Sequence, residues 1–530
     1  MTGGIDRRNA RLVLVAMTLA NAMILVDQTA VPLTLPEIMR QFTIGSQSVQ
    51  WVLNASLLPL AGLLVLGGRL GDLFGRRRVF ILGACMFAGA SAVGGFAPLF
   101  TVLLAARVVQ GIGGALMLPA TVAIVSASFS RADRGRALGS MGGIAAIAGA
   151  LGPTIGGFLT SAISWRAVLL VNAPLAVVCI YITLRSVPAD EPRTEGAHID
   201  VSGTALLCVA LSGLVFGFSQ TQSWGWGSPG VIGPLVVSVV AAGLFVLRER
   251  RARNPLMSFG LLAHQRNYLG ATLSQGLAGM AEMGLAVLFP LLLILNLGMT
   301  PVLAGIALIP TTVPMVLVAP MAGRWYDRSG GRPPLMTGFA ILALAGVVLA
   351  WGTNSNEYLQ VLPGLLLYGV GLAFVLTVND PVSLDTIPDT EQGQASGVSA
   401  TAEQGGGALG IALLYALFHA TYVNRLESIV NADRRIKDLT TKSSIALKNA
   451  IQAAESTGLK PSHFSHQLQQ YLFPANAASE HGYAVAFMAS SVIAILGFVA
   501  VAGLVRRPST EDSPTTDEPE AAGSVDAAVP

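Results

Sequence analysis

Charged residues are scarce in this 530-residue chain and make up only 12% of it. Soluble domains carry roughly 25%, so the shortage argues against a soluble protein. No basic face exists outside the short loops, which excludes a nucleic-acid partner. The three cysteines, Cys85, Cys179 and Cys208, all lie inside apolar runs, so neither a disulfide framework nor a metal site is expected.

The motifs of several enzyme classes are also absent. The sequence has no Walker A lysine, no G-x-S-x-G and no pair of histidines spaced to bind zinc on a helix. We therefore expect no enzyme, no use of ATP and no cofactor. A membrane enzyme or a sensor remains a minor alternative, and a sensor would need a folded output domain that the short polar tail does not provide.

Long apolar runs make up most of the sequence. Hydrophobic residues form 53% of the chain and mean hydropathy is +0.63. Runs of about 20 residues recur, the length that crosses a ~30 Å hydrocarbon core. The first run contains Asp27 and is too long for a cleaved signal peptide. We predict an all-α polytopic membrane protein with fourteen transmembrane helices, at residues 12–36, 49–69, 79–98, 101–126, 137–162, 165–185, 200–221, 230–248, 267–294, 301–322, 334–352, 358–380, 393–421 and 482–504.

Arginines are distributed unevenly between alternate loops. Those on the side of the amino terminus are rich in arginine, whereas four short loops on the other side hold no Lys or Arg: 98–101, 221–230, 295–301 and 353–357. Short loops rich in Lys and Arg stay in the cytoplasm. Both termini are therefore predicted to be cytoplasmic, in a multi-pass protein of the cytoplasmic (inner) membrane.

Two loops of the chain are copies of each other. "GGRLGDLFGRRR" at 67–78 aligns with "AGRWYDRSGGRP" at 322–333 at an offset of 255 residues, so that Arg69 meets Arg324 and Asp72 meets Asp327. The two loops follow predicted spans 2 and 10. Parallel six-span repeats around a substrate site near the midplane are a known transporter architecture. We therefore predict two six-helix halves, at 1–185 and 256–505, separated by two extra helices within 186–255.

Two further segments are not apolar. Residues 422–481 form a long loop on the external side, with sequences typical of amphipathic helices. We interpret it as a solvated helical hairpin, with a role in gating or partner binding as the alternative. The tail at 506–530 has acids and prolines with few bases, and is predicted to be a disordered cytoplasmic tail.

Several motifs together resemble the major facilitator superfamily. Residues 67–78 look like its cytoplasmic loop signature, "RVVQGIGGALMLPA" at 107–120 resembles its arginine-bearing motif, and "GALGPTIGGFL" at 149–159 resembles the antiporter motif of its exporters. "VDQTAVPLTLPEI" at 26–38 and "SWRAVLLVNAPLA" at 164–176 are similar to the fourteen-span drug:proton antiporter branch, the QacA/EmrB type. The resemblance covers nearly all of the membrane part.

The resemblance implies a role for the repeated loop. In the superfamily it acts as a latch that closes the cytoplasmic face, with an acid pairing across to a neighbouring helix. The alternative is that the arginines only fix topology. The predicted latch residues are Gly68, Arg69, Asp72, Gly75, Arg76, Arg324 and Asp327.

Predicted span 5 carries a glycine face interrupted by a proline. Glycines at this spacing let another helix pack closely, and the proline bends the span. Ordinary membrane packing would explain the same composition, but the resemblance implies that the kink favours export. The motif residues are Gly149, Gly152, Pro153, Gly156 and Gly157.

Four ionisable residues lie deep in predicted spans: Asp27, Arg107, Glu282 and Glu403. Each costs roughly 2.5–3.5 kcal/mol at a helix centre, so each needs a partner or a function. Burial disfavours a charged carboxylate and a nearby cation favours it, which suits a group that exchanges a proton for a cation. Asp27 and Arg107 match family motifs and are assigned to proton coupling, and the two glutamates to proton or substrate binding. A structural Asp27–Arg107 pair is the alternative.

The sequence thus predicts a monomeric, proton-driven exporter of amphipathic, possibly cationic, small molecules. Its partners would be the substrate, protons and the bilayer. Export of a lipid or lysolipid, or of a metabolite or antibiotic made by the host cell, is the alternative on the same scaffold.

Overall fold

The computed structural model describes residues 7–129, 131–190, 200–225, 227–252, 265–353, 357–384, 387, 392–432 and 472–505. These residues form helices and connecting turns, without a strand among them. Thirteen helices are long and apolar enough to cross a membrane, and a bent pair, 140–149 with 151–162, brings the number to fourteen. The 41° bend lies beside Pro153, which cannot donate the hydrogen bond of a straight helix. The predicted all-helical fold is confirmed, with span 5 as the bent one.

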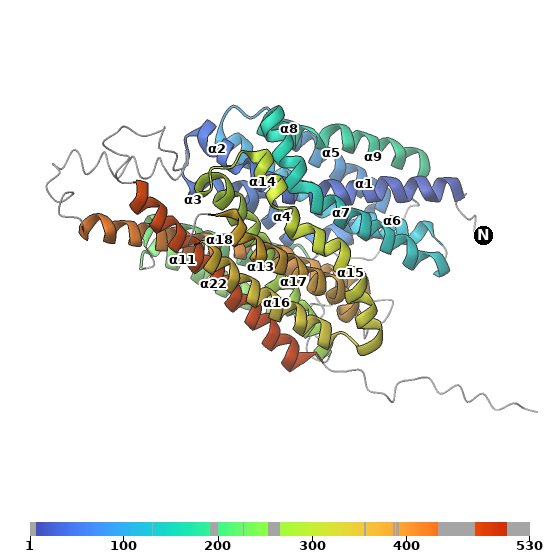
Figure 1. Ribbon diagram of the computed structural model, residues 1–530. Coiled ribbons are helices and arrows are strands. Elements are labelled where there is room, and N and C mark those ends of the chain that lie inside the picture. The colour runs from blue at the N-terminus through green and yellow to red at the C-terminus, as the bar shows by residue number, and fades with distance from the viewer. Residues whose placement is uncertain are drawn as a thin grey trace, which may run out of the picture.

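The first six spans pack into one bundle (Figure 1). A core of Met17, Phe80, Phe87 and Met117 fills its interior. The helices of this amino-terminal half are α1 (Arg7–Ala30), η1 (Val31–Thr34), α2 (Leu35–Phe42), α3 (Ser46–Val49), α4 (Trp51–Phe74), α5 (Arg76–Gly95), α6 (Phe100–Ser128), α7 (Arg131–Ala162), α8 (Trp165–Leu170) and α9 (Asn172–Ser186).

The last six spans form a second bundle, whose core includes Phe339, Tyr415 and Phe487. Leu33 and Leu35 of η1 and α2 join the same core, which ties the two halves together. The helices of this carboxy-terminal half are α13 (Arg266–Leu291), η2 (Leu292–Asn296), α14 (Pro301–Ala307), α15 (Ile309–Ser329), α16 (Arg332–Gly352), α17 (Tyr358–Leu384), α18 (Gln392–Ala432) and α22 (Leu472–Leu504).

The predicted repeat has the same backbone conformation in both halves. Gly75 ends α4 with φ +100° and Gly330 ends α15 with φ +74°, a region that favours glycine. Just after these turns, Arg77 donates from Nη2 to the carbonyl oxygen of Leu184 (2.8 Å), and Arg332 donates from Nη2 to that of Ala502 (2.6 Å). In each half the arginine thus ties the loop to the last helix of its own bundle.

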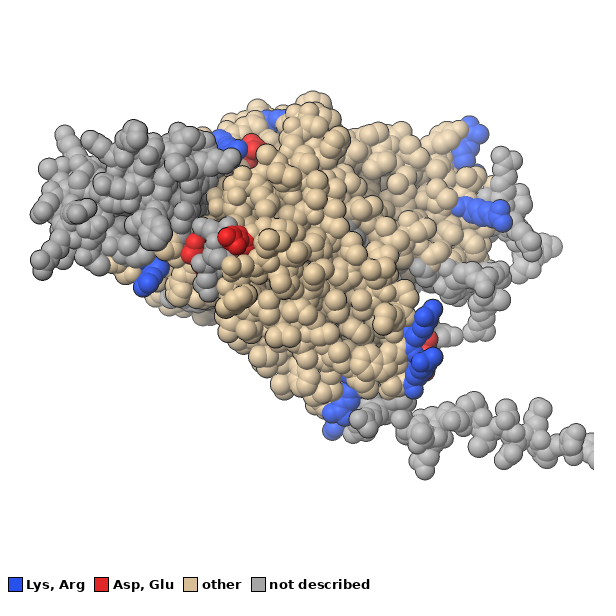
Figure 2. Space-filling model, in the orientation of Figure 1, with Lys and Arg blue, Asp and Glu red and all other residues tan. Residues whose placement is uncertain are grey.

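These turns lie at one end of the molecule, hereafter the arginine-rich end. Figure 2 shows Lys and Arg side chains at this end, at the right of the view, and a largely uncharged surface between the two ends. The two bundles diverge toward it in Figure 1. At the opposite end α7 packs against α14, and η1 packs against α13 and α14, so the halves meet there.

The two extra helices, α10 (Val201–Trp224) and α11 (Pro229–Glu249), pair with each other beside the two halves. Among the described residues α10 makes the larger contact with the rest, touching α4 and α18, one from each half, and Phe245 of α11 joins a small cluster with Val65 and Tyr268. Cys208 lies so close to Gly62 of α4 that a Cβ there would be 2.5 Å from its sulfur, and Leu211 packs against Gly405 of α18. Helix α10 therefore lies across one of the seams between the halves.

The predicted long loop is only partly described. Helix α18 continues past the predicted end of its span to Ala432, and α22 begins at Leu472, ahead of the predicted start of the last span. The two membrane helices thus extend into both ends of predicted loop 422–481, and the predicted hairpin stays a prediction. Residues 433–471 and the predicted tail 506–530 lie outside the described residues.

Candidate functional site

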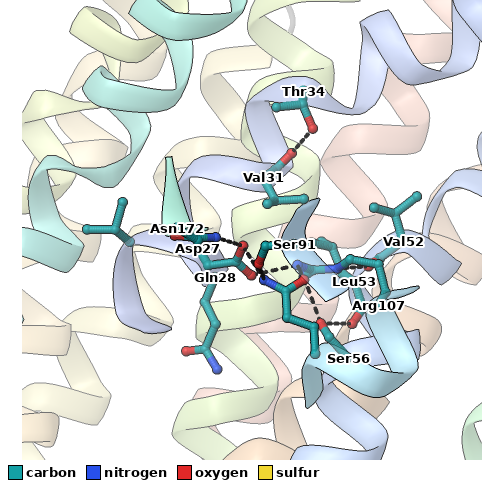
Figure 3. Close-up of polar contacts among 12 residues, drawn as sticks. Asp27, Gln28, Val31, Thr34, Val52, Leu53, Ser56, Ser91, Arg107 and Asn172 are labelled. Carbon is teal, nitrogen blue, oxygen red and sulfur yellow. Dashed lines mark hydrogen bonds and ion pairs between the residues drawn. The ribbon is translucent and has the colours of Figure 1, made fainter. Parts of the chain in front are cut away.

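A buried ion pair forms the centre of the amino-terminal half. Arg107 of α6 donates from Nη1 to Oδ2 of Asp27 on α1 at 2.6 Å (Figure 3). Their side chains are 1% and 5% exposed, so water does not screen the pair. The two residues are 80 positions apart in the sequence, and the packing of α1 against α6 brings them together. The structure thus contains the pair that the sequence left as an alternative.

Uncharged groups form hydrogen bonds with the remaining donors and acceptors of Asp27 and Arg107. The other oxygen of Asp27, Oδ1, accepts from the amides of Gln110 and Asn172, both at 3.0 Å. Arg107 also donates to the carbonyl oxygen of Val52 (2.8 Å) and to the hydroxyl of Ser56 (2.7 Å). Helices α1, α4, α6 and α9 therefore share one hydrogen-bonded network, and each charge is stabilised by several partners.

Sequence reasoning missed the neutral members of this network. Gln110 lies three residues after Arg107, accepts from it at 2.7 Å and donates to Ser91 of α5 at 2.9 Å. It stands inside the quoted motif of span 4, and Asn172 stands inside the quoted motif of span 6. An i, i+3 spacing from a deep arginine was the available signal for Gln110.

The carboxy-terminal half has a polar core of a different kind. Glu403 of α18 accepts a hydrogen bond from the amide of Gln275 on α13 at 2.5 Å. Asn379 of α17 donates to the side chain of Gln275 and to the carbonyl oxygen of Ala271 (3.1 Å), and accepts from Ser274. The partner of this carboxylate is therefore an uncharged amide rather than a cation.

Glu282 lies on α13, seven residues after Gln275. Its Oε2 atom is buried and has no hydrogen-bond partner within the described part of the chain. Its backbone carbonyl accepts from the hydroxyl of buried Tyr368 at 3.3 Å. Asp380, which follows Asn379, is exposed. Over the described ranges none of Glu282, Asp380 and Glu403 forms an ion pair, so this half contains carboxylates without a cation.

The two polar cores lie next to each other across the interface between the halves. Gln28, beside Asp27, donates from Nε2 to Oε1 of Gln404, beside Glu403, at 3.0 Å. Both glutamines are buried. A cavity of about 10 Å³, close to the space of a single water molecule, adjoins this bond and is lined by Gln28, Pro32, Leu53, Ser56, Leu57, Arg107, Met283, Ala286 and Ile411.

The glycines of the antiporter motif pack against α1 next to Asp27. A Cβ at Gly152 would lie 1.8 Å from the hydroxyl of Thr29, and one at Gly156 would lie 2.6 Å from the carbonyl oxygen of Ala30. The Thr29 hydroxyl also donates to the carbonyl of Gly149 at 2.8 Å. The close helix contact predicted for this face is therefore made with the helix that carries Asp27.

The same motif also touches the other half. A Cβ at Gly157 would lie 2.2 Å from the carbonyl oxygen of Pro301, and one at Gly305 would lie 2.6 Å from that of Pro153. Thr154 donates to the carbonyl of Gly305 at 3.3 Å. These contacts join α7 to α14 at the end opposite the arginines, so the motif is part of the closed end of the molecule.

The structure describes most residues of the predicted latch. Gly68 faces Pro119 of α6, and Arg76 donates to the carbonyl oxygen of Ala123 at 3.3 Å. Arg69 is half-buried, while Arg324 and Asp327 are exposed and form no ion pair with any described residue. The side chain of Asp72 lies outside the described residues. The latch therefore stays a prediction.

A carboxylate that the sequence did not single out lies at the first loop. Asp190, after α9, accepts from the backbone N–H groups of Arg77 (3.1 Å) and Arg78 (2.9 Å) at the start of α5. It satisfies donors that a helix leaves free at its amino terminus. No three His, Cys, Asp or Glu side chains come together as metal ligands do in the ranges that the structure describes.

Comparisons with known proteins agree with this architecture. The family model of the Major Facilitator Superfamily matches residues 17–411. The multidrug resistance protein Stp of Mycobacterium tuberculosis is 32% identical over 87% of this chain and 86% of its own length. The tetracenomycin C resistance and export protein of Streptomyces glaucescens is 30% identical over 94% and 92%.

A solved structure shares the fold. It is an inward-facing, unoccupied bacterial homologue of the human lysosomal transporter Spinster, with a TM-score of 0.62, 14% identity and coverage of 94% of this chain and 98% of its own. The fourteen predicted spans, the paired six-helix halves and the family match lead to one conclusion. The chain belongs to the major facilitator superfamily and is a transporter, not an enzyme.

Proposed function

We propose that this transporter exports amphipathic small molecules across the cytoplasmic membrane in exchange for protons. The names of the relatives support resistance and export as the role. The distribution of Lys and Arg supports a cytoplasmic location for the arginine-rich end and for both termini. In this orientation the structure is closed toward the outside, where α7 packs against α14.

The observation that carries proton coupling is the pair of glutamates without a cation. Glu403 is held by a neutral amide, and one oxygen of Glu282 has no described partner. An ionised carboxylate at membrane depth is costly unless a positive charge is near. A proton and a cationic substrate would each neutralise the same site, so binding of one would release the other.

Asp27 and Arg107 would couple this exchange to movement of the halves. Their pair holds together four helices of the amino-terminal half, and Gln28 links it to the helix of Glu403. Protonation of Asp27 would weaken the pair and free Arg107 to reorient. In this scheme the glutamates bind the substrate or the proton, and the aspartate transmits the change.

The class of substrate has a second candidate. One relative is named for export of tetracenomycin C as well as resistance to it. Export of a metabolite or antibiotic made by the same cell is therefore the alternative to general drug efflux. Both candidates use the same coupling.

The experiment measures substrate-induced proton flux in proteoliposomes that contain a pH-sensitive dye. Lipophilic cations, neutral antibiotics and lysolipids are added under an imposed pH gradient. We expect lipophilic cations to drive proton flux in the wild-type protein, and Glu403→Gln, Glu282→Gln and Asp27→Asn each to reduce it strongly. Glu37→Gln is the matched control, because Glu37 forms a partly exposed pair with Arg40 outside both cores. Full flux in all three core variants would refute the proposal.

A further inference from the structure

A groove separate from the transport site runs between α16 and α22. Its volume is about 600 Å³, and its walls are mainly apolar, with Met336, Ala340 and Leu344 from α16 and Phe498 from α22. Arg332, the first residue of α16, lines the groove at the arginine-rich end of the molecule. The only other polar side chain among its described walls, Thr337, bonds to the carbonyl oxygen of Pro333 at 3.0 Å.

The length of the groove matches one leaflet of a membrane. The wall residues of α16 run from Arg332 to Leu344, and twelve residues of helix rise about 18 Å at 1.5 Å each. Half of a ~30 Å hydrocarbon core is about 15 Å. The groove thus leads from the level of the lipid headgroups, at Arg332, to the middle of the bilayer.

Arg332 keeps donors free for an anion. One of its terminal nitrogens, Nη2, is fixed on the carbonyl oxygen of Ala502, while a guanidinium carries five N–H donors. The arginine forms no ion pair with a described residue and stands at the positive end of a helix dipole. Exposed Arg324 and Arg328 on the end of neighbouring α15 add positive charge, and Figure 2 shows basic side chains at this end.

In the amino-terminal half a carboxylate occupies the place equivalent to the surroundings of Arg332. There Arg77 is the counterpart of Arg332, and Asp190 supplies a carboxylate to the N–H groups of Arg77 and Arg78. In the carboxy-terminal half no described carboxylate bonds to Arg332, and Pro333 takes the place of Arg78. The side chain of Arg332 is therefore available to an anion at this place.

We propose that this groove binds an anionic diacyl phospholipid of the adjacent leaflet. Arg332 holds the phosphate, one acyl chain lies along Met336, Ala340 and Leu344, and the second chain stays in the bilayer. A free phosphate ion would leave the apolar walls uncovered, and a zwitterionic lipid would place its own cation beside the arginine. The site is independent of the transport function proposed above.

The test titrates the full-length protein, delipidated in mild detergent, with phosphatidylglycerol and counts bound lipids by native mass spectrometry. We expect one tightly bound lipid on the wild-type protein, and affinity at least about tenfold lower in Arg332→Gln and Ala340→Phe. The first variant removes the charge and the second fills the groove from an exposed position. Arg332→Lys, which keeps a positive charge, should retain more binding than Arg332→Gln.

Two matched controls separate the groove from the general surface. Arg328→Gln removes an exposed arginine at the same end, and Val347→Phe adds an aromatic ring to an exposed position of α16 beyond the groove. Both should bind like wild type. Equal binding of phosphatidylcholine by the wild-type protein, or unchanged binding in both groove variants, would overturn the proposal. Elution as a single species and a cooperative thermal transition like that of the wild type establish that each variant is folded.

Discussion

The two halves share a fold but treat buried charge in opposite ways. In the amino-terminal half the carboxylate of Asp27 is neutralised by Arg107 and by two amides. In the carboxy-terminal half the described hydrogen-bond partner of the Glu403 side chain is the amide of Gln275, and Glu282 has an oxygen without a described partner. One half therefore contains an ion pair within a hydrogen-bonded network that joins its helices. The other contains acids that form no ion pair with a described residue.

The largest effect is expected from breaking the completed network. Arg107→Met should destabilise the protein by about 3–5 kcal/mol, because it leaves the carboxylate of Asp27 buried without its cation. Thermal unfolding in detergent measures this change. The double variant Arg107→Met/Asp27→Asn should recover part of the lost stability. A single variant as stable as the wild type would show that the pair does not hold the half together.

The second largest effect is expected from a substitution at the contact between α7 and α14, where the halves meet. Gly157→Ala should slow transport by roughly 5- to 150-fold, since a Cβ 2.2 Å from the carbonyl of Pro301 prevents closure and overpacking costs about 1–3 kcal/mol. Efflux from proteoliposomes is the measurement. Gly143→Ala on the same helix is the control, because no atom lies within 4 Å of the added Cβ. Equal rates in the two variants would contradict a role for this contact.

A substitution can also remove the difference between the halves by giving the carboxy-terminal half a cation beside its carboxylate. Gln275→Lys would place a cation beside Glu403, as Arg107 stands beside Asp27. We expect substrate-induced proton flux to fall at least about tenfold, because the carboxylate would stay ionised. The neutral Gln275→Met variant serves as the control and should retain more flux. Undiminished flux in the lysine variant would indicate that Glu403 carries no proton.

The smallest effect is expected outside both halves. Burial opposes ionisation of Asp200, but hydrogen bonds from Gly203, Ser202 and Arg248 lower the pKa of this carboxyl below its usual range. Asp200 caps the amino terminus of α10, so Asp200→Ala should cost about 0.5–2 kcal/mol at neutral pH.

The pH dependence of this cap follows from the direction of the shift. A lowered pKa contributes stability that is present above the unfolded value and is lost as pH falls through the folded one, so the difference between variant and wild type should shrink below about pH 4. Thermal unfolding of both proteins across this range measures it. A difference that does not change with pH would mean that the cap acts without its charge.

Much of the fold could be predicted because lipid makes strict demands on sequence. Span length, arginine asymmetry and the repeated loop gave fourteen helices in two halves, and the glycine-ended turns at Gly75 and Gly330 follow from the repeat. The deep charges could be found because each is rare at that depth. Their partners could not. Gln28 and Gln404 are 376 residues apart, and neutral amides in a span give no signal until packing brings them together.

The sequence therefore singled out the charged residues of the two polar cores and missed the neutral ones. Gln275 and Asn379, 104 residues apart, connect Glu403 to two helices, yet nothing in either local sequence points to the other. The cytoplasmic latch, by contrast, has a clear pattern in the sequence. The side chain of Asp72, the acid that would pair, lies outside the described residues, so the latch stays a prediction.

The hydrogen bond between Gln28 and Gln404 bears on the speed of the cycle. A bond between two neutral amides contributes a net of about 0.5–1.5 kcal/mol, because water replaces it when it opens. A buried arginine–carboxylate pair in the same place would hold the halves several times more firmly. The protein thus keeps its strong buried ion pair inside one half and places a weaker, more easily broken amide–amide bond between the two halves.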